Sequence, residues 1–432
     1  METFHSGGVE AQPPQAHVGL TPMKIQQPVS ASRIEPCGIK LITHLDLKDR
    51  ELFPDAFRMI RGVKQLCREY PDDFEAVVQI LSRSRETAPR FFPQGRVLKG
   101  TSTYWIHASG KKAVVERVNY DRGYSCPSEE EFGTYLGENM LPYRANVVQI
   151  GGHSRSFRCI ADFTPKRVRR SFEIAHEMTG QKPDLAFFDG CQTSSHESML
   201  EFAENDTVPF VIGYPVVQYL SGADCALMLR EALNKSGSLK EKWMAMMDGL
   251  PGGEGTNRYN LIDVRKTITL ARKLDDLGEA FFPITKGKVD RAKFTACLSI
   301  TRIINGEKGR ETAGLGDLAM LLGGLFLYFY EPESLREGIR EAEKALEEVI
   351  VRQFPSQDFF LGLPAQYGLC FQASTKTTGF RYNENHSNRD KYRDVRVGHS
   401  WKRLIRRCSQ DDEFSQTSEY RVVGPIQRGT GL

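Results

Sequence analysis

The sequence lacks the features that would mark a secreted, zinc-binding or membrane protein. Its nine cysteines form no CxxC pair and have no regular spacing, which argues against a disulfide framework or structural zinc site and indicates a reducing compartment. The longest apolar run, from Leu318 to Tyr330, contains two glycines and is too short to cross a bilayer, so a buried helix is expected there. The net charge is only +3 and gives no general argument for nucleic acid as a partner.

Both ends of the chain are polar. Residues 1–37 hold several Pro, Gln and Ser residues and no apolar core, which predicts a disordered segment and not a signal peptide. Residues 409–432 are predicted to form a flexible tail. With neither a signal peptide nor a membrane span, the expected location is cytoplasmic.

The 432 residues and the 40% hydrophobic content are enough for two domains. The best linker is the glycine-rich segment 248–257. We therefore predict one domain over residues 38–247 and a smaller, mainly helical domain over residues 258–408.

Hydrophobic periodicity predicts further elements along the chain. The clearest is a helix from Leu335 to Phe354, which Pro332 and Ser334 begin and Glu337 completes with a capping box. About six strands are expected in the first domain. The earlier elements are a strand at 39–43, a helix at 49–68, an ambiguous run at 76–81, two strands near 96–98 and 103–107, and a helix at 129–141.

The centre of the chain has the pattern of a βαβ crossover. Apolar runs at 145–150 and 184–188 flank an amphipathic stretch at 166–178, and a third apolar run covers 208–213. Such crossovers are almost always right-handed, so the two flanking strands run parallel and end at one edge of the sheet. That edge is where open α/β folds bind ligands.

A thiol and an imidazole are expected at that edge. His153 and Cys191 each follow one of the two predicted strands by three residues. An imidazole can help to form a thiolate and then protonate a leaving amine, so the pair suggests nucleophilic catalysis. The simpler alternative is that Cys191 is a small core residue.

The residues around Cys191 support the catalytic interpretation. Backbone N–H groups in the turn at Gly190 and Cys191 are suited to stabilise an oxyanion. A helix is expected to start directly after Cys191, capped by Ser194 or Ser195, and its N-terminus would lower the pKa of the thiol.

Two blocks of sequence, Asn146-Val-Val-Gln-Ile-Gly-Gly-His153 and Leu185-Ala-Phe-Phe-Asp-Gly-Cys191, resemble the His and Cys blocks of clostripain-like cysteine peptidases. The resemblance implies a caspase-like fold, a mostly parallel α/β sheet sandwiched by helices, with a His–Cys dyad. Weaker counterparts of other family blocks lie at Ile262-Asp263, Asp317-Leu318, Gly368-Leu369-Cys370 and Tyr392…Trp401. The spacing of His and Cys is 38 residues, shorter than the roughly 50 in caspases.

The resemblance also implies cleavage after Arg or Lys, which requires an acidic pocket because a buried guanidinium must be paired. Asp189 is the first candidate for that substrate-binding carboxylate, although it is equally an ordinary Asp-Gly turn residue. A second carboxylate is unassigned, with Asp224 a candidate. The family has Gly after its catalytic His, where the N–H joins the oxyanion hole, and Ser154 stands there in this sequence. Some relatives need calcium, but no dense carboxylate loop is present, and no cofactor is expected.

Relatives can cleave themselves between the His and the Cys. The basic cluster in that segment, Lys166, Arg167, Arg169 and Arg170, is the expected self-cleavage site because a loop-to-helix junction can fray. The alternative is that these residues are only the solvated start of a helix.

The function that these patterns favour is a cysteine endopeptidase acting on proteins or peptides, latent until triggered, with a possible regulatory protein partner. One alternative is an inactive caspase-fold scaffold that binds partner proteins. The other is a nucleic-acid-binding protein that uses residues 381–407, where nine Lys and Arg residues outnumber three Asp and Glu among aromatic side chains. The sequence gives neither the natural substrate, the trigger, the pathway nor the oligomeric state.

Overall fold

The computed structural model describes most of the chain from Gly38 to Ser409, and these residues belong to one compact unit, Glu35–Leu432. The predicted disordered segment 1–37 and nearly all of the predicted tail lie outside the described residues. The described ranges are 38–47, 52–87, 97–110, 112–121, 125–154, 160–191, 193–215, 224–250, 259–300, 315–354, 359–360, 363–364, 369–372 and 399–409.

A nine-stranded sheet forms the centre of this unit, with the order β10-β8-β7-β6-β5-β1-β2-β3-β4. The five central strands, from β7 to β2, run parallel, and antiparallel strands extend the sheet at both edges. The strands are β1 (Ile39–Leu47), β2 (Phe74–Thr87), β3 (Val97–Ser109), β4 (Lys112–Asp121), β5 (Ala145–Gly151), β6 (Leu185–Asp189), β7 (Phe210–Gly213), β8 (Tyr259–Asp263) and β10 (Ile350–Phe354).

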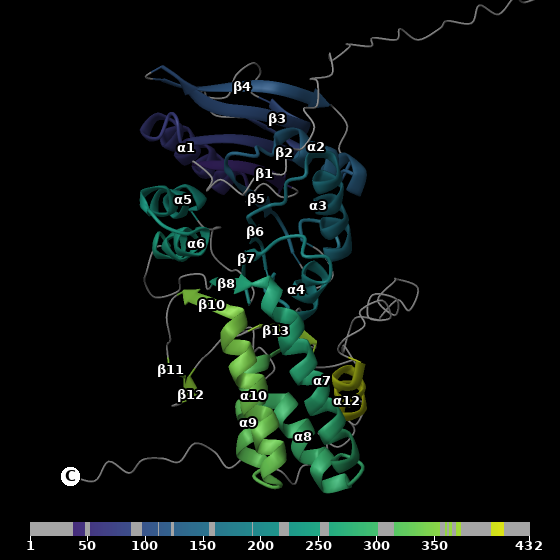
Figure 1. The fold of residues 1–432 in the computed structure, drawn as a ribbon. Coiled ribbons are helices and arrows are strands. Elements are labelled where there is room, and N and C mark those ends of the chain that lie inside the picture. Colours follow the sequence, from purple (N-terminus) through teal and green to yellow (C-terminus); the bar gives the residue numbers. More distant parts are fainter. Residues whose placement is uncertain are drawn as a thin grey trace, which may run out of the picture. The chain divides into compact units, whose positions relative to one another are not determined.

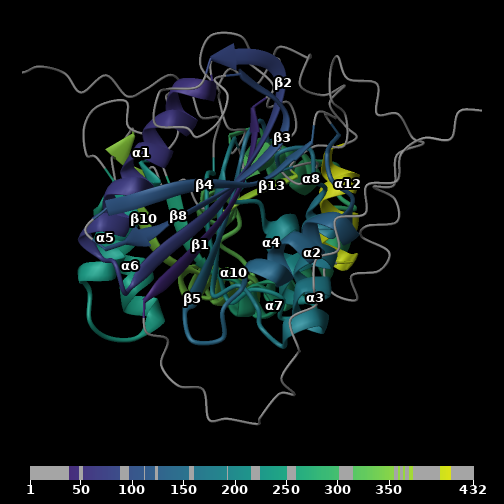
Figure 2. The ribbon, with the colours of Figure 1, turned by 90° about the horizontal axis from the view of Figure 1, so that it is seen from above.

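Helices cover both faces of the sheet (Figure 1). Seen from above in Figure 2, α1, α5 and α6 lie on one side of the strands, and α2, α3 and α4 lie on the other. Their bounds are α1 (Phe53–Glu69), α2 (Glu129–Asn139), α3 (Pro165–Thr179), α4 (His196–Ala203), α5 (Cys225–Asn234) and α6 (Leu239–Asp248).

Residues of the central strands alternate between the two covered faces. Val147 and Phe187 belong to the core shared with α1, α5 and α6, whereas Val148 and Phe188 belong to the core shared with α2, α3 and α4. Because both faces are buried, these strands have continuous apolar runs and not an apolar–polar alternation. The two runs that the sequence assigned to neighbouring strands are therefore β5 and β6, paired in parallel.

The crossover helix α3 has clear local signals at both ends. The side chain of Thr164 accepts a hydrogen bond from the backbone N–H of Arg167, and Pro165 occupies the first turn. Gly180 ends the helix in the left-handed region, at φ 70°, where glycine is the least strained residue. The predicted helix at 166–178 is confirmed within one residue at each end.

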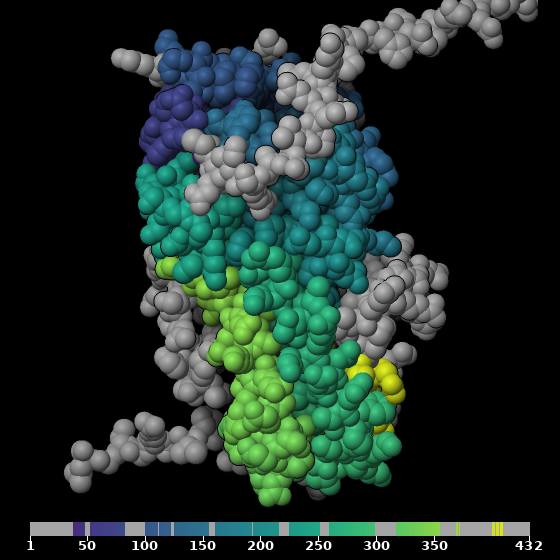
Figure 3. All heavy atoms as spheres, viewed as in Figure 1, coloured from purple at the N-terminus to yellow at the C-terminus, as the bar shows by residue number. Residues whose placement is uncertain are grey.

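The described residues after β8 are mainly helical. Two small strand pairs accompany the helices, β9 (Leu315–Asp317) with β13 (Cys370–Gln372), and β11 (Phe359–Phe360) with β12 (Leu363–Pro364). Helices α7 and α10 lie side by side, as the green surface in Figure 3 also shows. The helices are α7 (Thr267–Ile284), α8 (Lys288–Ile300), α9 (Leu318–Tyr328), α10 (Glu333–Val349) and α12 (His399–Ser409), with a 3-10 turn, η2 (Val264–Lys266), before α7.

Two predictions about these elements are wrong. The helix expected to reach Phe354 ends at Val349, and the following five residues form β10, which pairs with β8. Ile350 and Val351 suit a strand as well as a helix, and the edge of the sheet offers hydrogen bonds that a longer helix would forgo. The predicted capping box is also absent, since Pro332 is the N-cap and no side chain caps the helix.

The predicted division at residues 248–257 stays a prediction. Residues 251–258 lie outside the described residues, and β8 and β10, which follow them, pair into the same sheet as the strands before them. Within the described part of the chain, no helix combines the length and the apolar character needed to span a bilayer.

Candidate active site

Two loops leave the same edge of the sheet side by side. Gly151, the last residue of β5, is the register partner of Asp189, the last residue of β6. The N–H of Gly152 donates to the carbonyl of Asp189 at 3.2 Å and extends this pairing into the loops. His153 and Cys191 each follow their strand by two residues, so the sheet carries both to one rim.

A cavity of about 140 Å³ lies at this rim, and both His153 and Cys191 line it. The imidazole is exposed and the thiol is half-buried. The opposite wall is apolar and comes from β1 and α1, through residues that include Leu45, Leu47 and Met59. The structure therefore brings the two predicted residues together in one solvent-accessible pocket.

The cavity also has an acidic side. Asp189 and Asp224 both line it, and both are half-buried. Burial first, and then the charges of these two carboxylates, raise the pKa of the Cys225 thiol well above its usual range, so both charges act near one point. Asp224 is oriented as the N-cap of α5, where Oδ1 accepts the N–H groups of Ala226 and Leu227 at 3.2 Å each.

An ion pair lies on the α1 side of the cavity. Asp55 and Arg58 both line the pocket, and Oδ1 of Asp55 lies 2.9 Å from the Arg58 guanidinium. Sequence reasoning missed this pair, because α1 has no pattern that distinguishes its pocket-facing residues from an ordinary solvated turn.

The loop that follows Cys191 is held by a buried hydroxyl that sequence reasoning also missed. Oγ1 of Thr193 donates to the carbonyls of Phe188 and Gly190, at 3.0 and 3.3 Å, and accepts the N–H of Tyr214 at 2.8 Å. These bonds tie Thr193, two residues beyond Cys191, to β6, to Gly190 and to the residue after β7.

The helix after the loop starts later than predicted. It begins at His196 and not directly after Cys191, with Ser195 as its N-cap. Of the two predicted caps, Ser195 is confirmed, and its hydroxyl accepts the N–H of Ser198 at 3.3 Å.

Ser154 turns its side chain into the protein. It is buried, and its hydroxyl donates to the carbonyl of Gly152 and accepts the N–H of Ala161, both at 3.4 Å. Ser154 also forms an isolated antiparallel bridge with Ile160. The roles of the Ser154 and Cys191 N–H groups as oxyanion donors stay predictions.

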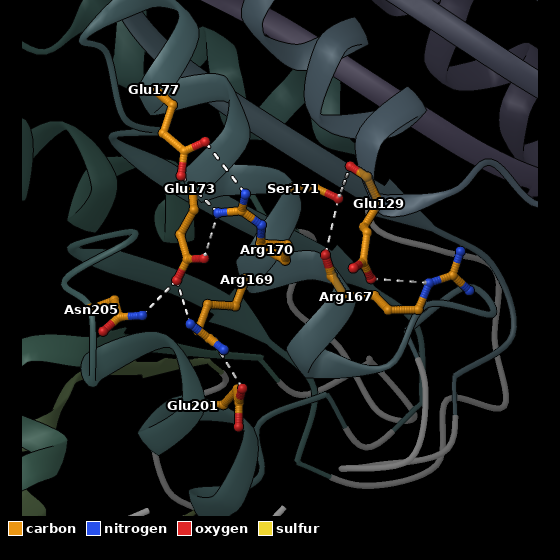
Figure 4. A network of polar contacts seen from close by, with 9 residues as sticks. All are labelled: Glu129, Arg167, Arg169, Arg170, Ser171, Glu173, Glu177, Glu201 and Asn205. Atoms are coloured by element: carbon orange, nitrogen blue, oxygen red, sulfur yellow. Dashed lines mark hydrogen bonds and ion pairs between the residues drawn. The ribbon is translucent and has the colours of Figure 1, made fainter. Parts of the chain in front are cut away.

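The predicted self-cleavage cluster lies inside α3, and its three arginines form ion pairs there (Figure 4). Arg169 is nearly buried between Glu173 of its own helix and Glu201 of α4, with Nε 2.9 Å from the Glu201 carboxylate. Arg170 pairs with Glu173 and Glu177 at 3.3 and 2.7 Å.

The other two members of the cluster lie in the first turn of α3. Arg167 donates to the carbonyl of Pro127 at 2.7 Å and lies near Glu129, while Lys166 is exposed. The cluster is therefore part of a regular helix and not of a loop, and the prediction that it is cleaved stays untested.

No group of three or more His, Cys, Asp or Glu side chains is arranged to hold a metal ion within the described ranges.

When the whole chain is compared with known proteins, solved structures match it and sequence comparisons do not. No model of a known protein family matches the chain, and no curated protein matches it in sequence. Solved structures do match it in fold. An inactive zymogen C11 protease from Parabacteroides distasonis has a TM-score of 0.58 at 12% identity, over 87% of this chain and all of the other.

Two further matches come from Bacteroides thetaiotaomicron. The secreted C11 cysteine protease iotapain has a TM-score of 0.57 at 11% identity, over 78% of this chain and 93% of the other. A secreted C11 cysteine protease in complex with an irreversible peptide inhibitor has a TM-score of 0.54 at 12% identity, over 85% and 98% of the two chains. The predicted α/β, caspase-like architecture is thus confirmed, and the chain has the fold of C11, clostripain-like cysteine proteases.

Proposed function

We propose that the protein is a cysteine endopeptidase, a hydrolase in which Cys191 is the nucleophile and His153 is the general acid and base. One observation carries this proposal: on a fold shared with C11 cysteine proteases, a thiol and an imidazole from neighbouring parallel strands line a single cavity. That arrangement is what nucleophilic catalysis by a thiol requires.

The chemistry proceeds in two halves. His153 accepts the thiol proton, and the Cys191 sulfur attacks the carbonyl carbon of the scissile peptide bond. As the tetrahedral intermediate collapses, the imidazolium gives its proton to the leaving amine, and an acyl-enzyme thioester remains. Water, deprotonated by His153, then attacks the thioester and releases the new carboxyl end and the thiol.

The negative charge on the attacked oxygen needs hydrogen-bond donors. We assign this role to the backbone N–H groups of Ser154 and Cys191, which follow the candidate base and form part of the nucleophile turn, respectively. Replacing a family glycine by Ser154 keeps the donor, because any residue except proline carries a backbone N–H. A fixed N–H dipole in a pocket sheltered from water is worth far more than one in bulk water.

The cavity favours a basic side chain at P1, the substrate residue before the scissile bond. The methylene stem of Arg or Lys fits the apolar wall formed by Leu45, Leu47 and Met59, while Asp189 and Asp224 offer carboxylates to its charge. Two half-buried carboxylates in one pocket repel each other and gain from a cation between them. We therefore propose that both carboxylates recognise P1.

Self-processing and latency are finer parts of the same proposal. One of the structures with this fold is an inactive zymogen, and the chain carries basic residues between His153 and Cys191 that a P1-basic peptidase would recognise. A regulatory protein partner and a cytoplasmic location also belong to the proposal. They rest on the sequence pattern alone.

One of the aromatic residues on which the nucleic-acid alternative depends is not accessible. Trp401 is buried against Phe294, with ring centroids 6.4 Å apart, and does not offer a face for base stacking. Residues 381–398 of the basic stretch lie outside the described residues, and residues 399–407 belong to α12. The scaffold alternative remains the competitor, and peptide turnover separates it from an enzyme.

The deciding experiment is a panel of fluorogenic peptides that differ only at P1, assayed with the wild-type protein and with Cys191→Ala. Turnover of the Arg and Lys peptides by the wild type alone supports the proposal. Equal turnover by both proteins would assign the activity to a contaminant, and no turnover of any peptide by processed and unprocessed protein would favour the scaffold.

A further inference from the structure

The His153 loop and the Cys191 loop are packed against each other at one glycine. A Cβ atom added to Gly190 would lie 2.2 Å from Oγ of Ser154, 2.8 Å from Cβ of Ser154 and 2.6 Å from the carbonyl oxygen of Gly152. All three distances are shorter than real Cβ contacts. The second loop therefore has no room for any side chain where Ser154 of the first loop lies.

Hydrogen bonds of Ser154 and Gly152 also hold this contact in place. The Ser154 hydroxyl is bonded to the carbonyl of Gly152 and to the N–H of Ala161, so its side chain has few other orientations. Gly152 is itself bonded to Asp189, the residue before Gly190. The side chain is buried, so water does not compete for these bonds.

We propose that Ser154 is a positioning residue: by seating its side chain on Gly190, it fixes the loop that presents His153 against the loop that presents Cys191. The proposal rests on the His–Cys dyad proposed above and extends it to a side chain, that of Ser154, which touches neither substrate nor reacting atoms, whereas its backbone N–H is the oxyanion donor proposed above. The smallest side chain with a hydroxyl fills the space over the glycine, and a glycine at 154 would leave it empty.

Position matters here because proton transfer depends steeply on geometry. The base must lie within hydrogen-bond reach of the thiol or of the leaving amine, and a displacement of about 1 Å can cost about a hundredfold in rate. His153 is exposed and is the second residue beyond β5, so the sheet alone does not fix its loop. A contact one residue along the chain supplies that restraint.

Four variants separate positioning from simple loss of packing. Ser154→Ala keeps Cβ and removes the hydroxyl, Ser154→Gly removes both, and Gly190→Ala adds the clash. The double variant Ser154→Gly/Gly190→Ala removes two of the three clashing atoms and leaves only the Gly152 carbonyl.

Matched controls come from a second interface, between α2 and α3. Ser171→Ala removes a buried hydroxyl that bonds to the Glu129 carbonyl at 3.0 Å, and Gly133→Ala adds a Cβ 2.7 Å from Cβ of Ile174. Both controls should lower stability without changing the catalytic constants of the folded protein.

The first measurement is the free energy of unfolding, by urea denaturation, of the four proteins of a double-mutant cycle. These are the wild type, Ser154→Gly, Gly190→Ala and the double variant. We expect Gly190→Ala to destabilise the Ser154→Gly protein less than it destabilises the wild type, a coupling that is characteristic of direct contact. Additive effects would overturn the contact on which the proposal depends, whether or not the protein is a peptidase.

The second measurement is the pH profile of Cys191 alkylation by iodoacetamide, followed by peptide mapping, with kcat and KM on the best P1 peptide. Ser154→Ala should lower kcat about tenfold with little change in KM. It should also shift the pH profile of Cys191 alkylation towards the profile of His153→Ala. Ser154→Gly should lower kcat more and shift the profile further in the same direction. A wild-type profile and kcat in Ser154→Ala would overturn the positioning role. If His153→Ala itself leaves the profile unchanged, the dyad fails, and the coupling above still decides whether the two loops are joined.

Discussion

The hydroxyl of Tyr259 lies 3.5 Å from Oδ1 of Asp189, although the two residues are 70 positions apart in the sequence. Tyr259 is the first residue of β8, and it is almost fully buried, with Phe187 and Tyr214 packed edge-on against its ring. The strand that follows the glycine-rich segment thus reaches back to the carboxylate proposed to recognise P1. The buried hydroxyl that donates to Oδ1 of Asp189 restrains the direction of this carboxylate.

Removing that hydroxyl should weaken recognition of a basic P1 residue without stopping catalysis. In Tyr259→Phe we expect KM for Arg and Lys peptides to rise about threefold to tenfold, as the loss of one hydrogen bond of about 1 kcal/mol predicts, with kcat nearly unchanged. Asp189→Asn should cost more, roughly 2–5 kcal/mol in kcat/KM, because it leaves a substrate charge without its partner.

The control for Tyr259→Phe is Tyr135→Phe. Tyr135 is also buried, and its hydroxyl donates to the carbonyls of Thr43 and Val77, outside the pocket lining. Tyr135→Phe should lower the free energy of unfolding and leave KM unchanged. An unchanged KM in both tyrosine variants, or a preference for Asp at P1, would contradict the proposed pocket.

The cysteines should differ sharply in reactivity. Burial raises the pKa of Cys67 and Cys297 to about 12, and that of Cys225 is raised well above its usual range by burial and by two carboxylates. Since the thiolate is the reactive form, these three should stay unmodified by iodoacetamide in the folded protein at neutral pH. Cys191 lines an open cavity and should be alkylated first, as peptide mapping over time can establish.

The half-buried Cys126 is the internal reference for that experiment. We expect His153→Ala to slow alkylation of Cys191 relative to Cys126 without altering Cys126 itself. Equal rates at Cys126 and Cys191 in the wild type would argue that Cys191 is an ordinary thiol.

The parts of the site that the sequence predicts are those set by local pattern. Two apolar runs with a helix between them determine parallel pairing, and parallel pairing places His153 and Cys191 at one edge. The cap Ser195 was predicted for the same reason, because capping depends on neighbouring residues only. The prediction of a helix at residues 350–354 is wrong for the opposite reason: these residues form β10 because β8 is available to pair with them, and local pattern does not contain that contact.

The remaining site residues come from contacts that no local pattern encodes. Asp55 and Arg58 of α1 line the cavity. Tyr259 of β8 reaches Asp189, and Thr193 bonds to Tyr214, the residue after β7; all of these contacts depend on the tertiary arrangement. The close fit of Ser154 on Gly190 was equally invisible, because a serine beside a glycine 36 positions later has no periodic signature. One sequence signal did exist for Asp224, which precedes an apolar helical stretch as N-caps do.

Stability should fall in mildly acidic solution because of two buried histidines. Burial lowers the pKa of His44 and of His196 from 6.5 to about 4. Each is neutral in the fold at pH values where the unfolded chain is protonated, so the unfolded state binds more protons. The free energy of unfolding should therefore rise with pH between about 4 and 6.5, by up to about 1.4 kcal/mol per pH unit for each histidine.

The test is a series of urea denaturations from pH 4 to pH 8 on the wild type and on His44→Phe. The His44 ring packs against Phe132 and Phe163, both at 5.3 Å, so phenylalanine keeps the ring and loses the titration. The slope below pH 6.5 should become shallower in His44→Phe than in the wild type. Equal slopes in the two proteins would contradict the role of His44.

Self-cleavage in the basic cluster, if it follows the proposed P1 preference, should depend on how firmly each residue is held in α3. A peptidase binds its substrate as an extended chain, so the helix must unwind around the bond that is cut. The first turn, with Lys166 and Arg167, is held by the Thr164 cap at 3.2 Å, whereas Arg169 is held by carboxylates of two helices. Cleavage after Lys166 or Arg167 should therefore precede cleavage after Arg169 or Arg170.

Two variants change these restraints separately. Thr164→Ala removes a cap worth about 1 kcal/mol and should speed cleavage in the first turn about fivefold, while Glu201→Gln weakens the hold on Arg169 and should expose the later bonds. N-terminal sequencing of fragments after prolonged incubation measures both, with Cys191→Ala as the control that must stay intact because it lacks the proposed nucleophile. An intact chain in wild-type protein that turns over peptides would leave the cluster as a structural ion-pair network only, and first cleavage after Arg170 would contradict the order that the helix imposes.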